Sequence, residues 1–576
     1  MNYTEKYRMW LESPLIDEET KRELSSLKED PKEIEDRFYK DLEFGTGGLR
    51  GIIGAGSNRM NRYTVAKATQ GLANYIRKAG DKAIAGGVVI AYDSRRKSPE
   101  FALDAALVLC ANGIRTYLYT ELQPTPVLSF SVRELGATAG IVITASHNPP
   151  EYNGYKVYWS DGGQVPPHLD HEIIREVNNM ESFEAIRTMP VQWAKDKGLL
   201  RYIGEEVLVK YIQRVEDLCI DKELVKREGR NLKVIYTPIH GTGNKPVRRV
   251  LKELGFEQIT VVPQQEKPDP DFSTVAYPNP EEKEVFTLAI ALAEAKRADL
   301  IIGTDPDCDR VGVVAKNKQG EYVTLTGNQT GALLVHYCLN ALKSSGALPE
   351  NGCIIKTIVT GEMGRKIAES FGVDTIDTLT GFKFIGEKIK EFEETGSHTF
   401  LLGYEESYGY LAGDFVRDKD AVIASMLICE MAAWYRSRGM SLYDGLVSLW
   451  DRYGYFKETL KSIQMAGKEG MEKIRILMDD LRNDKPKEIG GVPVVRIEDY
   501  LESRAVDGKT GAETKLTLPV SNVLKYKLED GSWFCARPSG TEPKVKLYFS
   551  VTGSNAGEAD TKSKALTDAV FRLLKL

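Results

Sequence analysis

The feature that most limits the fold of this chain is the alternation of short apolar runs with segments of helical spacing. Val88–Tyr92 and Thr138–Thr144 are apolar runs of strand length, and Pro99–Asn112 between them has the spacing of a helix. Arg115–Tyr119 and Pro126–Leu135 read as a further strand and helix. Strands that alternate with helices form βαβ units, in which helices cover a mainly parallel sheet. This stretch therefore predicts an α/β domain.

The same pattern restarts twice farther along the chain, first after the charged helical stretch Glu205–Gly229. The expected strands and helices of the second block are Leu232–Thr237, Lys245–Leu254, Ile259–Val262, Glu281–Lys296 and Leu300–Thr304. Those of the third block are Cys353–Val359, Glu362–Phe371, Val373–Asp377, Lys383–Glu394 and His398–Gly403. No residue-level repeat joins the three blocks, so three similar α/β domains are inferred from the pattern alone.

The last block differs from the other three and predicts a smaller α+β unit. Its expected strands are Val492–Arg496, Val523–Lys527, Trp533–Arg537 and Val545–Val551, followed by the helix Asp560–Leu574. The segment up to Lys40 is charged and helical, and we expect it to pack on the first domain. A chain of 576 residues has room for about four domains. We predict their bounds as 1–208, 209–326, 327–455 and 456–576.

The composition is that of a soluble globular protein, with 42% hydrophobic and 28% charged residues and a net charge of −6. This charge argues against nucleic acid as a partner, although local arginines and lysines can still hold an anionic substrate. The longest apolar stretch, Ala421–Trp434, carries Glu430 and is too short to span a bilayer. The start of the chain lacks the apolar core of a signal peptide, and the seven cysteines form no CxxC pair. We therefore expect a cytoplasmic protein without a membrane partner.

A serine lies in a loop directly after one of the expected strands, in the motif Thr144-Ala-Ser-His-Asn-Pro-Pro. Loops at the carboxyl ends of strands are the usual place for sites in α/β sheets. Ser146 is a weak nucleophile until a base or a metal activates it, and His147 and Lys156 lie nearby in the sequence. Because serine, asparagine and proline also favour turns, this segment alone fits a plain turn equally well.

Three carboxylates meet in a second loop, Gly303-Thr-Asp-Pro-Asp-Cys-Asp-Arg, which also follows an apolar strand. Without a cation, Asp305, Asp307 and Asp309 would repel one another, and hard oxygen ligands suit Mg²⁺ or Ca²⁺. An EF-hand is excluded because its glycine and glutamate positions hold Arg310 and Lys316. Three protein carboxylates suit Mg²⁺, which retains phosphate or water ligands. A solvated acidic turn is the alternative.

Three further segments offer groups for binding phosphate or sugar. Arg537-Pro-Ser-Gly-Thr-Glu-Pro-Lys-Val-Lys combines cations, hydroxyls and exposed backbone N–H groups, which suits a phosphate dianion. Gly403-Tyr-Glu-Glu-Ser-Tyr-Gly lies at a strand end, where Glu405 and Ser407 can bond a polyol. Phe44-Gly-Thr-Gly-Gly-Leu-Arg can wrap a phosphate with Arg50 as its counter-charge, but it is no P-loop. Each segment, taken alone, also fits a surface turn.

Together, these five segments resemble the α-D-phosphohexomutase family, in that family's order and with one key loop per domain. The resemblance covers residues from about 40 to 550. It implies four domains around a central cleft, three of them α/β and the last a smaller α+β unit, in agreement with the pattern above.

The resemblance also implies a role for each loop. Ser146 would carry a phosphoryl group, and Asp305, Asp307 and Asp309 would bind one Mg²⁺ per chain together with an oxygen of Ser146. Catalytic roles would fall to Ser146, Lys156, His147 and Arg50, with Lys156 or His147 as the base. The substrate would be held by Arg310, Lys383, Glu405, Ser407, Arg537, Ser539, Gly540, Thr541 and Lys546. The family often has arginine where this chain has Lys546, so that role is less secure.

The form of the sugar loop resembles glucose-preferring members of the family. We therefore expect interconversion of glucose 1-phosphate and glucose 6-phosphate, with glucose 1,6-bisphosphate as intermediate and activator. A pentose or mannose phosphate as the substrate stays an alternative, as do a metal-dependent sugar phosphatase and a silent sugar-phosphate sensor. A sensor would be expected to lack Ser146 or an aspartate, and all are present. We expect a monomer or a weak homodimer.

Overall fold

The computed structural model of the chain describes residues 2–43, 48–180, 182–465, 467–539 and 544–575. The chain divides into two compact units, which are described separately. Unit 1 comprises Met1–Thr326, Phe382–Gly403 and Ser407–Ser441, and unit 2 comprises Gly327–Gly381, Tyr404–Glu406 and Leu442–Leu576.

Three amphipathic helices open unit 1: α1 (Tyr3–Glu12), α2 (Glu18–Ser26) and α3 (Pro31–Phe38). The buried indole of Trp10 contacts Phe38 of α3 edge-on, at a ring-centroid distance of 5.7 Å. Its edge contacts with Tyr63 and Phe183, at 5.5 and 5.3 Å, join the helices to the first domain. These contacts confirm that the N-terminal helical segment packs on the first domain.

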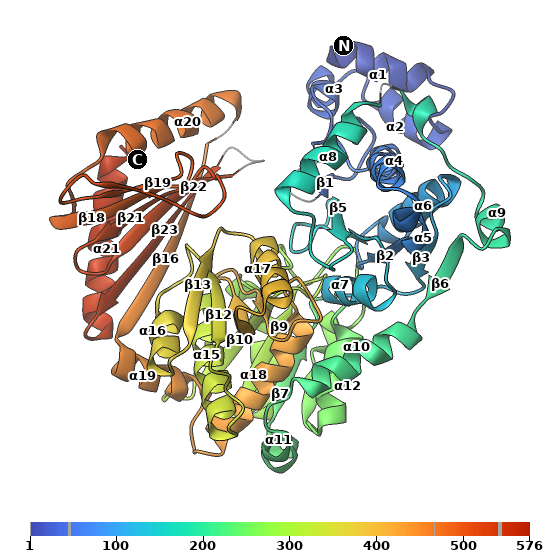
Figure 1. The fold of residues 1–576 in the computed structure, drawn as a ribbon. Coiled ribbons are helices and arrows are strands. Elements are labelled where there is room, and N and C mark those ends of the chain that lie inside the picture. The colour runs from blue at the N-terminus through green and yellow to red at the C-terminus, as the bar shows by residue number, and fades with distance from the viewer. Residues whose placement is uncertain (1, 44–47, 181, 466, 540–543, 576) are drawn as a thin grey trace. The chain divides into compact units, whose positions relative to one another are not determined.

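A six-stranded sheet follows, in the order β1-β5-β4-β2-β3-β6 (Figure 1). Its strands are β1 (Gly48–Ile52), β2 (Val88–Tyr92), β3 (Thr116–Tyr119), β4 (Ala139–Ile143), β5 (Tyr152–Trp159) and β6 (Leu200–Ile203). The connecting helices are α4 (Arg62–Lys78), α5 (Asp81–Gly86), α6 (Ser98–Ala111), α7 (Thr125–Glu134), α8 (Pro167–Asn178) and α9 (Val191–Asp196). Strands β4, β2, β3 and β6 are parallel, whereas β5 runs antiparallel to β4 and β1. The βαβ prediction is confirmed, with β5 and β1 added at one edge through antiparallel pairings.

The second sheet of unit 1 has five strands in the order β11-β10-β9-β7-β8. They are β7 (Val234–Thr237), β8 (Ile259–Val261), β9 (Leu300–Thr304), β10 (Val311–Lys316) and β11 (Tyr322–Leu325). Its helices are α10 (Glu205–Asp217), α11 (Lys222–Glu228), α12 (Asn244–Leu254), α13 (Pro263–Glu266) and α14 (Thr287–Lys296). Strands β8, β7 and β9 are parallel, and β10 and β11 are antiparallel additions.

The helix that we expected over Glu281–Lys296 begins later than the sequence suggested. Residues Lys283–Phe286 form a 3₁₀ turn, and α14 begins only at Thr287. The backbone N–H of Glu282 donates to the carbonyl of Asn279 at 2.9 Å, which closes a turn just before this segment. Glu281 is therefore outside the helix and available to another loop.

Unit 1 is completed by α17 (Phe382–Thr395), most of β14 (Thr399–Tyr404), β15 (Tyr410–Leu411) and α18 (Ala421–Arg436). Helix α18 is the apolar stretch noted in the sequence, and almost all of its residues are buried. The carboxylate of Glu430 inside it accepts a hydrogen bond from the backbone N–H of Asp221 at 2.6 Å. Across the described residues, no helix combines the length and the apolar character that a membrane crossing requires.

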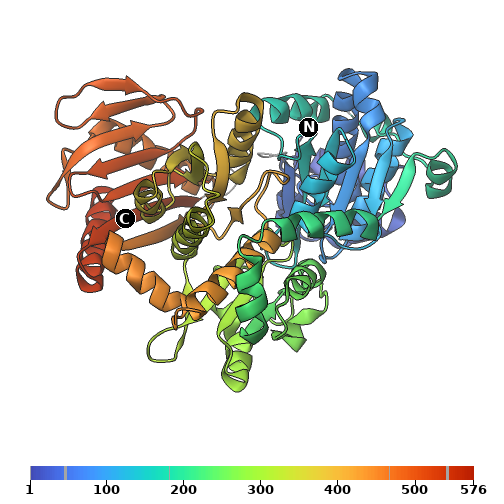
Figure 2. The same ribbon diagram turned by 60° about the horizontal axis from the view of Figure 1, so that its bottom comes forward.

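Unit 2 contains the parallel pair β12 (Gly352–Thr357) and β13 (Asp374–Thr378), with helices α15 (Gly327–Ser344), α16 (Met363–Ser370) and α19 (Leu442–Tyr453). Its C-terminal part is an antiparallel sheet in the order β16-β23-β22-β21-β18-β19-β20, drawn in orange and red in Figure 2. These strands are β16 (Tyr455–Gln464), β17 (Glu488–Ile489, paired with β18), β18 (Val492–Asp499), β19 (Arg504–Asp507), β20 (Glu513–Lys515), β21 (Leu524–Leu528), β22 (Trp533–Pro538) and β23 (Lys544–Gly553). Helices α20 (Gly467–Asp484) and α21 (Ala556–Leu573) accompany them.

Strand β16 was not anticipated from the sequence. It pairs with β23 over ten residues, from Tyr455 opposite Gly553 to Gln464 opposite Lys544. Most of its side chains are exposed or half-buried, so its sequence lacks the apolar run that indicates a strand. Pairing with a distant segment decides its conformation.

Candidate active site

Ser146 lies in the loop that follows β4, within unit 1. Its φ of 51° falls in the left-handed region, which a residue with a side chain adopts only when its surroundings hold it there. The backbone N–H of Ser146 donates to Thr144 Oγ1 at 2.8 Å, and its hydroxyl donates to Asp305 Oδ2 at 2.9 Å. The nucleophile predicted from the sequence is thus buried and faces the loop of aspartates.

His147 and Arg50 flank this serine. The Nδ1 atom of His147 lies 3.2 Å from Ser146 Oγ. Burial lowers the pKa of His147 well below its usual value, and the charges of Arg310 and Arg50 lower it further, so the imidazole is neutral near pH 7. Arg50 lies on β1 opposite Gly154 of β5, and its guanidinium donates to Asn148 Oδ1 at 2.9 Å. The first four residues of the glycine-rich motif, 44–47, lie outside the described residues.

The three aspartates converge in the loop after β9. Each of Asp305, Asp307 and Asp309 offers a carboxylate oxygen within 4.8 Å of the other two, and all three side chains are buried. Asp305 Oδ1 accepts the backbone N–H groups of Asp309 and Arg310, at 3.0 and 2.9 Å. Burial, followed by repulsion from the other two carboxylates, raises the pKa of Asp305 well above its usual value.

This loop fits a hard divalent cation. The Oδ1 atoms of Asp307 and Asp309 are buried and have no hydrogen-bond partner. A buried ionised oxygen without a partner is costly, and a bound cation would remove that cost. Three aspartates with oxygens to spare are the donor set that Mg²⁺ prefers when a phosphate supplies further ligands.

Two lysines face the aspartates. Lys156 Nζ lies 2.8 Å from Asp307 Oδ2 and 3.3 Å from Asp309 Oδ2. Burial alone would lower the pKa of Lys156, but attraction by these two carboxylates outweighs it and the pKa is raised. The second ammonium, that of Lys419, lies 3.2 Å from Asp309 Oδ2 and is also paired with Asp418. Sequence reasoning missed Lys419, whose only signal was the charged run Arg417–Asp420 before an apolar helix.

Thr125 is a second residue that sequence reasoning missed. It begins α7, and its hydroxyl donates to Asp307 Oδ2 at 3.0 Å, while its N–H donates to the Asp307 carbonyl at 2.9 Å. The positive end of α7 therefore lies next to the buried carboxylate of Asp307. A threonine in a Pro-Thr-Pro turn carries no sequence signal for this contact.

Two predicted substrate-binding cations are held by carboxylates. Arg310 Nη1 is 2.5 Å from Oε1 of Glu281, the residue that the late start of α14 leaves outside the helix. Lys383, at the start of α17, lies 3.6 Å from Asp170 Oδ2, and both side chains are buried. Each cation is thereby fixed by an ion pair with a carboxylate from another segment of unit 1.

The predicted sugar loop is anchored at both of its ends. In unit 1 the carbonyl of Tyr408, one residue after Ser407, accepts the N–H of Val311 at 3.1 Å, which ties it to the end of the aspartate loop. In unit 2, Glu405 Oε1 accepts the N–H of Gly381 at 2.9 Å. Oε2 of the next residue, Glu406, accepts hydrogen bonds from the hydroxyls of Thr357 and Thr360, at 3.3 and 3.1 Å.

The predicted phosphate loop lies in unit 2. Arg537 on β22 is opposite Lys546 on β23 in the sheet register, so the two cations share one end of this hairpin. Ser539 donates its backbone N–H to the Lys544 carbonyl at 2.8 Å. The predicted ligands Gly540 and Thr541 lie outside the described residues.

Four family models match consecutive stretches of the chain. They are domains I, II and III, each described as alpha/beta/alpha, and the C-terminal domain of phosphoglucomutase/phosphomannomutase, at residues 41–184, 209–320, 326–453 and 475–565. The chain belongs to the phosphoglucomutase/phosphomannomutase family. The resemblance noted in the sequence and the predicted fold class are both confirmed.

Individual members of the family show the same extent of likeness. A protein of Staphylococcus haemolyticus named phosphoglucomutase is 39% identical over 521 residues, which cover 90% of this chain and 92% of that relative. The solved structure of Paramecium parafusin (phosphoglucomutase), in its open form, matches with a TM-score of 0.68 at 18% identity, over 93% of this chain and 95% of that one. A family protein from Burkholderia thailandensis matches with a TM-score of 0.65 at 20% identity, over 92% and 96% of the two chains. At such identities these two structures bear on the fold alone.

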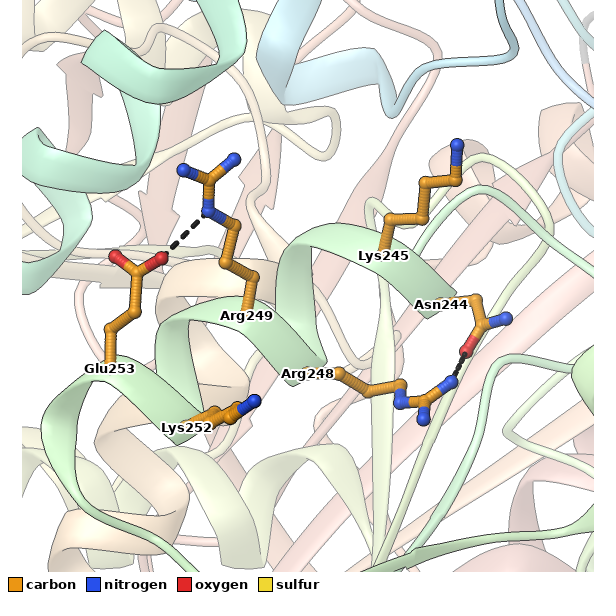
Figure 3. A pocket seen from close by; sticks show the side chains of 6 residues that line it. All are labelled: Asn244, Lys245, Arg248, Arg249, Lys252 and Glu253. Carbon is orange, nitrogen blue, oxygen red and sulfur yellow. Dashed lines mark hydrogen bonds and ion pairs between the residues drawn. The ribbon is translucent and has the colours of Figure 1, made fainter. Parts of the chain in front are cut away.

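A shallow hollow of about 550 Å³ lies on α12 and includes none of the predicted site residues (Figure 3). Its lining is Asn244, Lys245, Arg248, Arg249, Lys252 and Glu253. Arg248 is paired with Glu266 at 2.6 Å, Arg249 with Glu253 at 2.7 Å, and Lys245 with Glu121. Because carboxylates already pair with Lys245, Arg248 and Arg249, we assign no anion site to this hollow.

Proposed function

We propose that this chain is a phosphoglucomutase, which interconverts glucose 1-phosphate and glucose 6-phosphate. The observation that carries the proposal is the contact of Ser146 Oγ with Asp305 Oδ2, at 2.9 Å, beside two further buried aspartates. A hydroxyl aimed at a carboxylate cluster is the arrangement that phosphoryl transfer through a metal-bound serine requires. The curated relatives named phosphoglucomutase support glucose as the sugar.

Ser146 carries the phosphoryl group between the two halves of the reaction. In the first half, the Oγ–phosphorus bond of phospho-Ser146 breaks, and a bond forms between phosphorus and the free hydroxyl of the sugar monophosphate. The product of this step is glucose 1,6-bisphosphate, which then reorients in the site so that its other phosphate faces Ser146. In the second half, its other phosphate returns to Ser146, and the isomeric monophosphate leaves.

One Mg²⁺ would be held by Asp305, Asp307 and Asp309 together with an oxygen of Ser146. When bound, it supplies positive charge to the oxygens of the transferring phosphoryl group. Lys156, Arg50 and Arg310 surround the same oxygens and hold them in line. Such positioning and neutralisation provide most of the catalysis in phosphoryl transfer.

Protons must move in step with phosphorus. Of the two predicted candidates for the base, Lys156 and His147, the raised pKa of Lys156 favours His147, because an ammonium cannot accept a proton. The attacking sugar hydroxyl then loses its proton to His147, and Ser146 Oγ gains one when its bond to phosphorus breaks. The neutral imidazole of His147, with Nδ1 3.2 Å from Ser146 Oγ, is placed to handle the proton at the serine. Lys156, which faces two carboxylates, serves in this arrangement as a cation.

Separate loops would hold the rest of the substrate. Glu405, Ser407 and Lys383 read the sugar hydroxyls. The phosphate that does not react is bound by Arg537, Ser539, Gly540, Thr541 and Lys546. A loop that binds phosphate through several donors can accept it at either end of the sugar, as the two half-reactions require.

Two further points complete the proposal. The chain would fold as four domains with bounds 1–208, 209–326, 327–455 and 456–576. It would work in the cytoplasm, since its seven cysteines are all buried and free, as expected in a reducing compartment.

Parallel assays on glucose 1-phosphate, mannose 1-phosphate and ribose 1-phosphate, with Mg²⁺ and the matching bisphosphate, test the proposal. We expect the fastest turnover with glucose 1-phosphate and glucose 6-phosphate as its product. Release of inorganic phosphate without glucose 6-phosphate would identify a phosphatase instead. A higher kcat/KM for either of the other sugars would reassign the substrate within the family.

A further inference from the structure

One buried side chain, that of Arg95, binds the backbone of the Ser146 loop through hydrogen bonds. Arg95 lies between β2 and α6, and its guanidinium is fully buried. Nη2 donates to the carbonyls of Ser146, at 2.5 Å, and Asn148. Nη1 donates to the carbonyls of Pro149 and Tyr152, at 2.8 and 3.1 Å. One side chain thus binds four carbonyls of the segment that carries the nucleophile.

Arg95 is itself fixed by its neighbours. Its backbone N–H donates to Asp93 Oδ1 at 3.0 Å, and its Nε lies 3.3 Å from Asp93 Oδ2. The same carboxylate accepts the hydroxyls of Ser98 and Thr144, both at 2.7 Å. Thr144 in turn accepts the N–H of Ser146 at 2.8 Å. Asp93 therefore connects to both backbone groups of Ser146. It reaches the N–H through Thr144 and the carbonyl through Arg95.

The loop has a physical need for this support. Ser146 adopts a left-handed φ of 51°, which is unfavourable for a residue with a side chain. Carbonyls turned toward the interior also need donors, since a buried acceptor without one is costly. A guanidinium offers five donors in a rigid planar fork, whereas an ammonium offers three from a single point. Lysine could not reach the four carbonyls in the same way.

Arg95 also contacts the domain that supplies the aspartates. Its guanidinium stacks on the ring of Phe272, 4.9 Å from the ring centroid. The neighbouring Arg96 is paired with Asp271, but both of these side chains are about half exposed. Phe272 and Asp271 lie within the stretch that matches the second family domain, and that stretch also contains the aspartate loop.

We propose that Arg95 is a positioning residue that fixes Ser146 Oγ at the aspartate loop by holding the backbone carbonyls of residues 146–152. It contacts neither substrate nor the reacting atoms, and it acts through Ser146. Because its bonds go to the main chain, they are the same whether or not Ser146 carries phosphate. Both half-reactions then start from one position of the nucleophile. This inference rests on the function proposed above.

The test compares Arg95→Lys with Arg96→Lys, a matched control that makes the same change one residue away at an exposed ion pair. For Arg95→Lys we expect kcat to fall about 30- to 100-fold, because a misplacement of about 1 Å costs that much in transfer reactions. The KM for glucose 1-phosphate should stay within about threefold, since the phosphate and sugar loops are untouched. Arg96→Lys should keep kcat within about twofold of the wild type.

A second measurement separates positioning from stability. Loading of Ser146 with phosphate from glucose 1,6-bisphosphate, followed by intact mass, should slow in Arg95→Lys by the same factor as kcat, while circular dichroism shows a folded protein. A kcat within threefold of the wild type would overturn the inference, and so would a variant that is simply unfolded. If the wild type itself does not interconvert the sugar phosphates, the proposed function fails, and that result is distinct from either of these.

Discussion

The two units of this protein each bury a cluster of charges, and the clusters differ in how completely their charges are matched. In unit 1, Asp305, Asp307 and Asp309 face Lys156 and Lys419, and two carboxylate oxygens have no hydrogen-bond partner. This cluster has capacity left for a cation. Strong perturbation by burial and neighbouring charges is a mark of functional sites.

In unit 2, the buried ammonium of Lys356 lies 3.1 Å from carboxylate oxygens of both Glu362 and Asp377. Arg365 bridges the same two carboxylates, at 2.8 and 2.6 Å. Burial works against ionisation of Glu362, but Lys356 and Lys525 hold its pKa down at about 2. Two cations, Lys356 and Arg365, thus face two carboxylates, Glu362 and Asp377, and this balance of charge is the pattern of a structural ion network. Burial alone therefore does not mark a site. What distinguishes the cluster of unit 1 is that three carboxylates face two ammonium groups.

The largest expected effect concerns the nucleophile of unit 1. Ser146→Ala should lower mutase turnover about 10⁴-fold or more, because it removes the hydroxyl that contacts Asp305 and is proposed to carry the phosphoryl group. The melting temperature should stay within a few degrees of the wild type, since the change removes one oxygen and leaves the loop backbone held by Arg95. A coupled assay and a thermal melt check this, and turnover within tenfold of the wild type would refute the role of Ser146.

The next largest effect should follow from metal removal, which we expect to act on the aspartate cluster of unit 1 and not on the cluster of unit 2. A chelator should abolish turnover, and added Mg²⁺ should restore it. Mg²⁺ should also raise the melting temperature, since a ligand at about 100 times its dissociation constant stabilises the folded state by about 2.7 kcal/mol. Asp307→Asn should lose that stabilisation. A melting temperature that does not respond to Mg²⁺ in the wild type would contradict a metal role for the aspartates.

A matched pair of lysine variants compares the clusters directly. Lys356→Met leaves Glu362 and Asp377 without their ammonium, so it should lower the free energy of unfolding by about 3–5 kcal/mol. Lys156→Met, beside the aspartate loop, should lower kcat much more than stability when Mg²⁺ is present. Denaturant unfolding and steady-state kinetics on both variants test this contrast. Equal losses of stability in the two variants would show that the clusters do not differ as argued.

The smallest effect concerns pH and Glu458 on β16. Burial raises the pKa of Glu458 to about 7, and its Oε1 has no hydrogen-bond partner. The unfolded chain ionises this group near its ordinary pKa of about 4.3, so its contribution to stability is present below that pH and is lost as the pH rises through about 7. Glu458→Gln should therefore be more stable than the wild type at pH 8, by at most about 3–4 kcal/mol.

Melting curves of Glu458→Gln and the wild type at pH 5 and pH 8 check this prediction. The difference between the two proteins should shrink toward pH 5. A difference that is independent of pH would mean that Glu458 is ionised throughout. The aspartate loop provides a comparison, because there a bound cation should remove the penalty of ionisation that remains at Glu458.

Sequence reasoning found the strands whose side chains are buried on both faces, and it found the loops that follow them. β2 and β9 have the predicted bounds, because an uninterrupted apolar run reports burial directly. It missed β5 and β16, whose conformation depends on antiparallel partners elsewhere in the chain. It extended the helix before Lys296 back to Glu281, which lies instead in a turn that precedes the 3₁₀ segment Lys283–Phe286.

At the candidate site, too, some residues could be predicted from the sequence and others could not. Ser146 and the three aspartates were predictable, because each lies in a short motif that follows an apolar strand. Thr125, Lys419, Glu281 and Arg95 were not, because nothing in their local sequence indicates which distant group they meet. Thr125 is 182 residues from Asp307, and Arg95 is 51 residues from Ser146.

The sequence by itself thus determined the order of strands and helices, the family, and the groups that can carry phosphate and metal. The tertiary structure alone decided which charges are matched and which are left over. The reason is physical: secondary structure and motifs arise from interactions between near neighbours, whereas the charge around a buried carboxylate is the sum over every segment packed against it. Only the folded chain brings Lys156, Lys419 and Thr125 to three aspartates and still leaves two of their oxygens without a hydrogen bond.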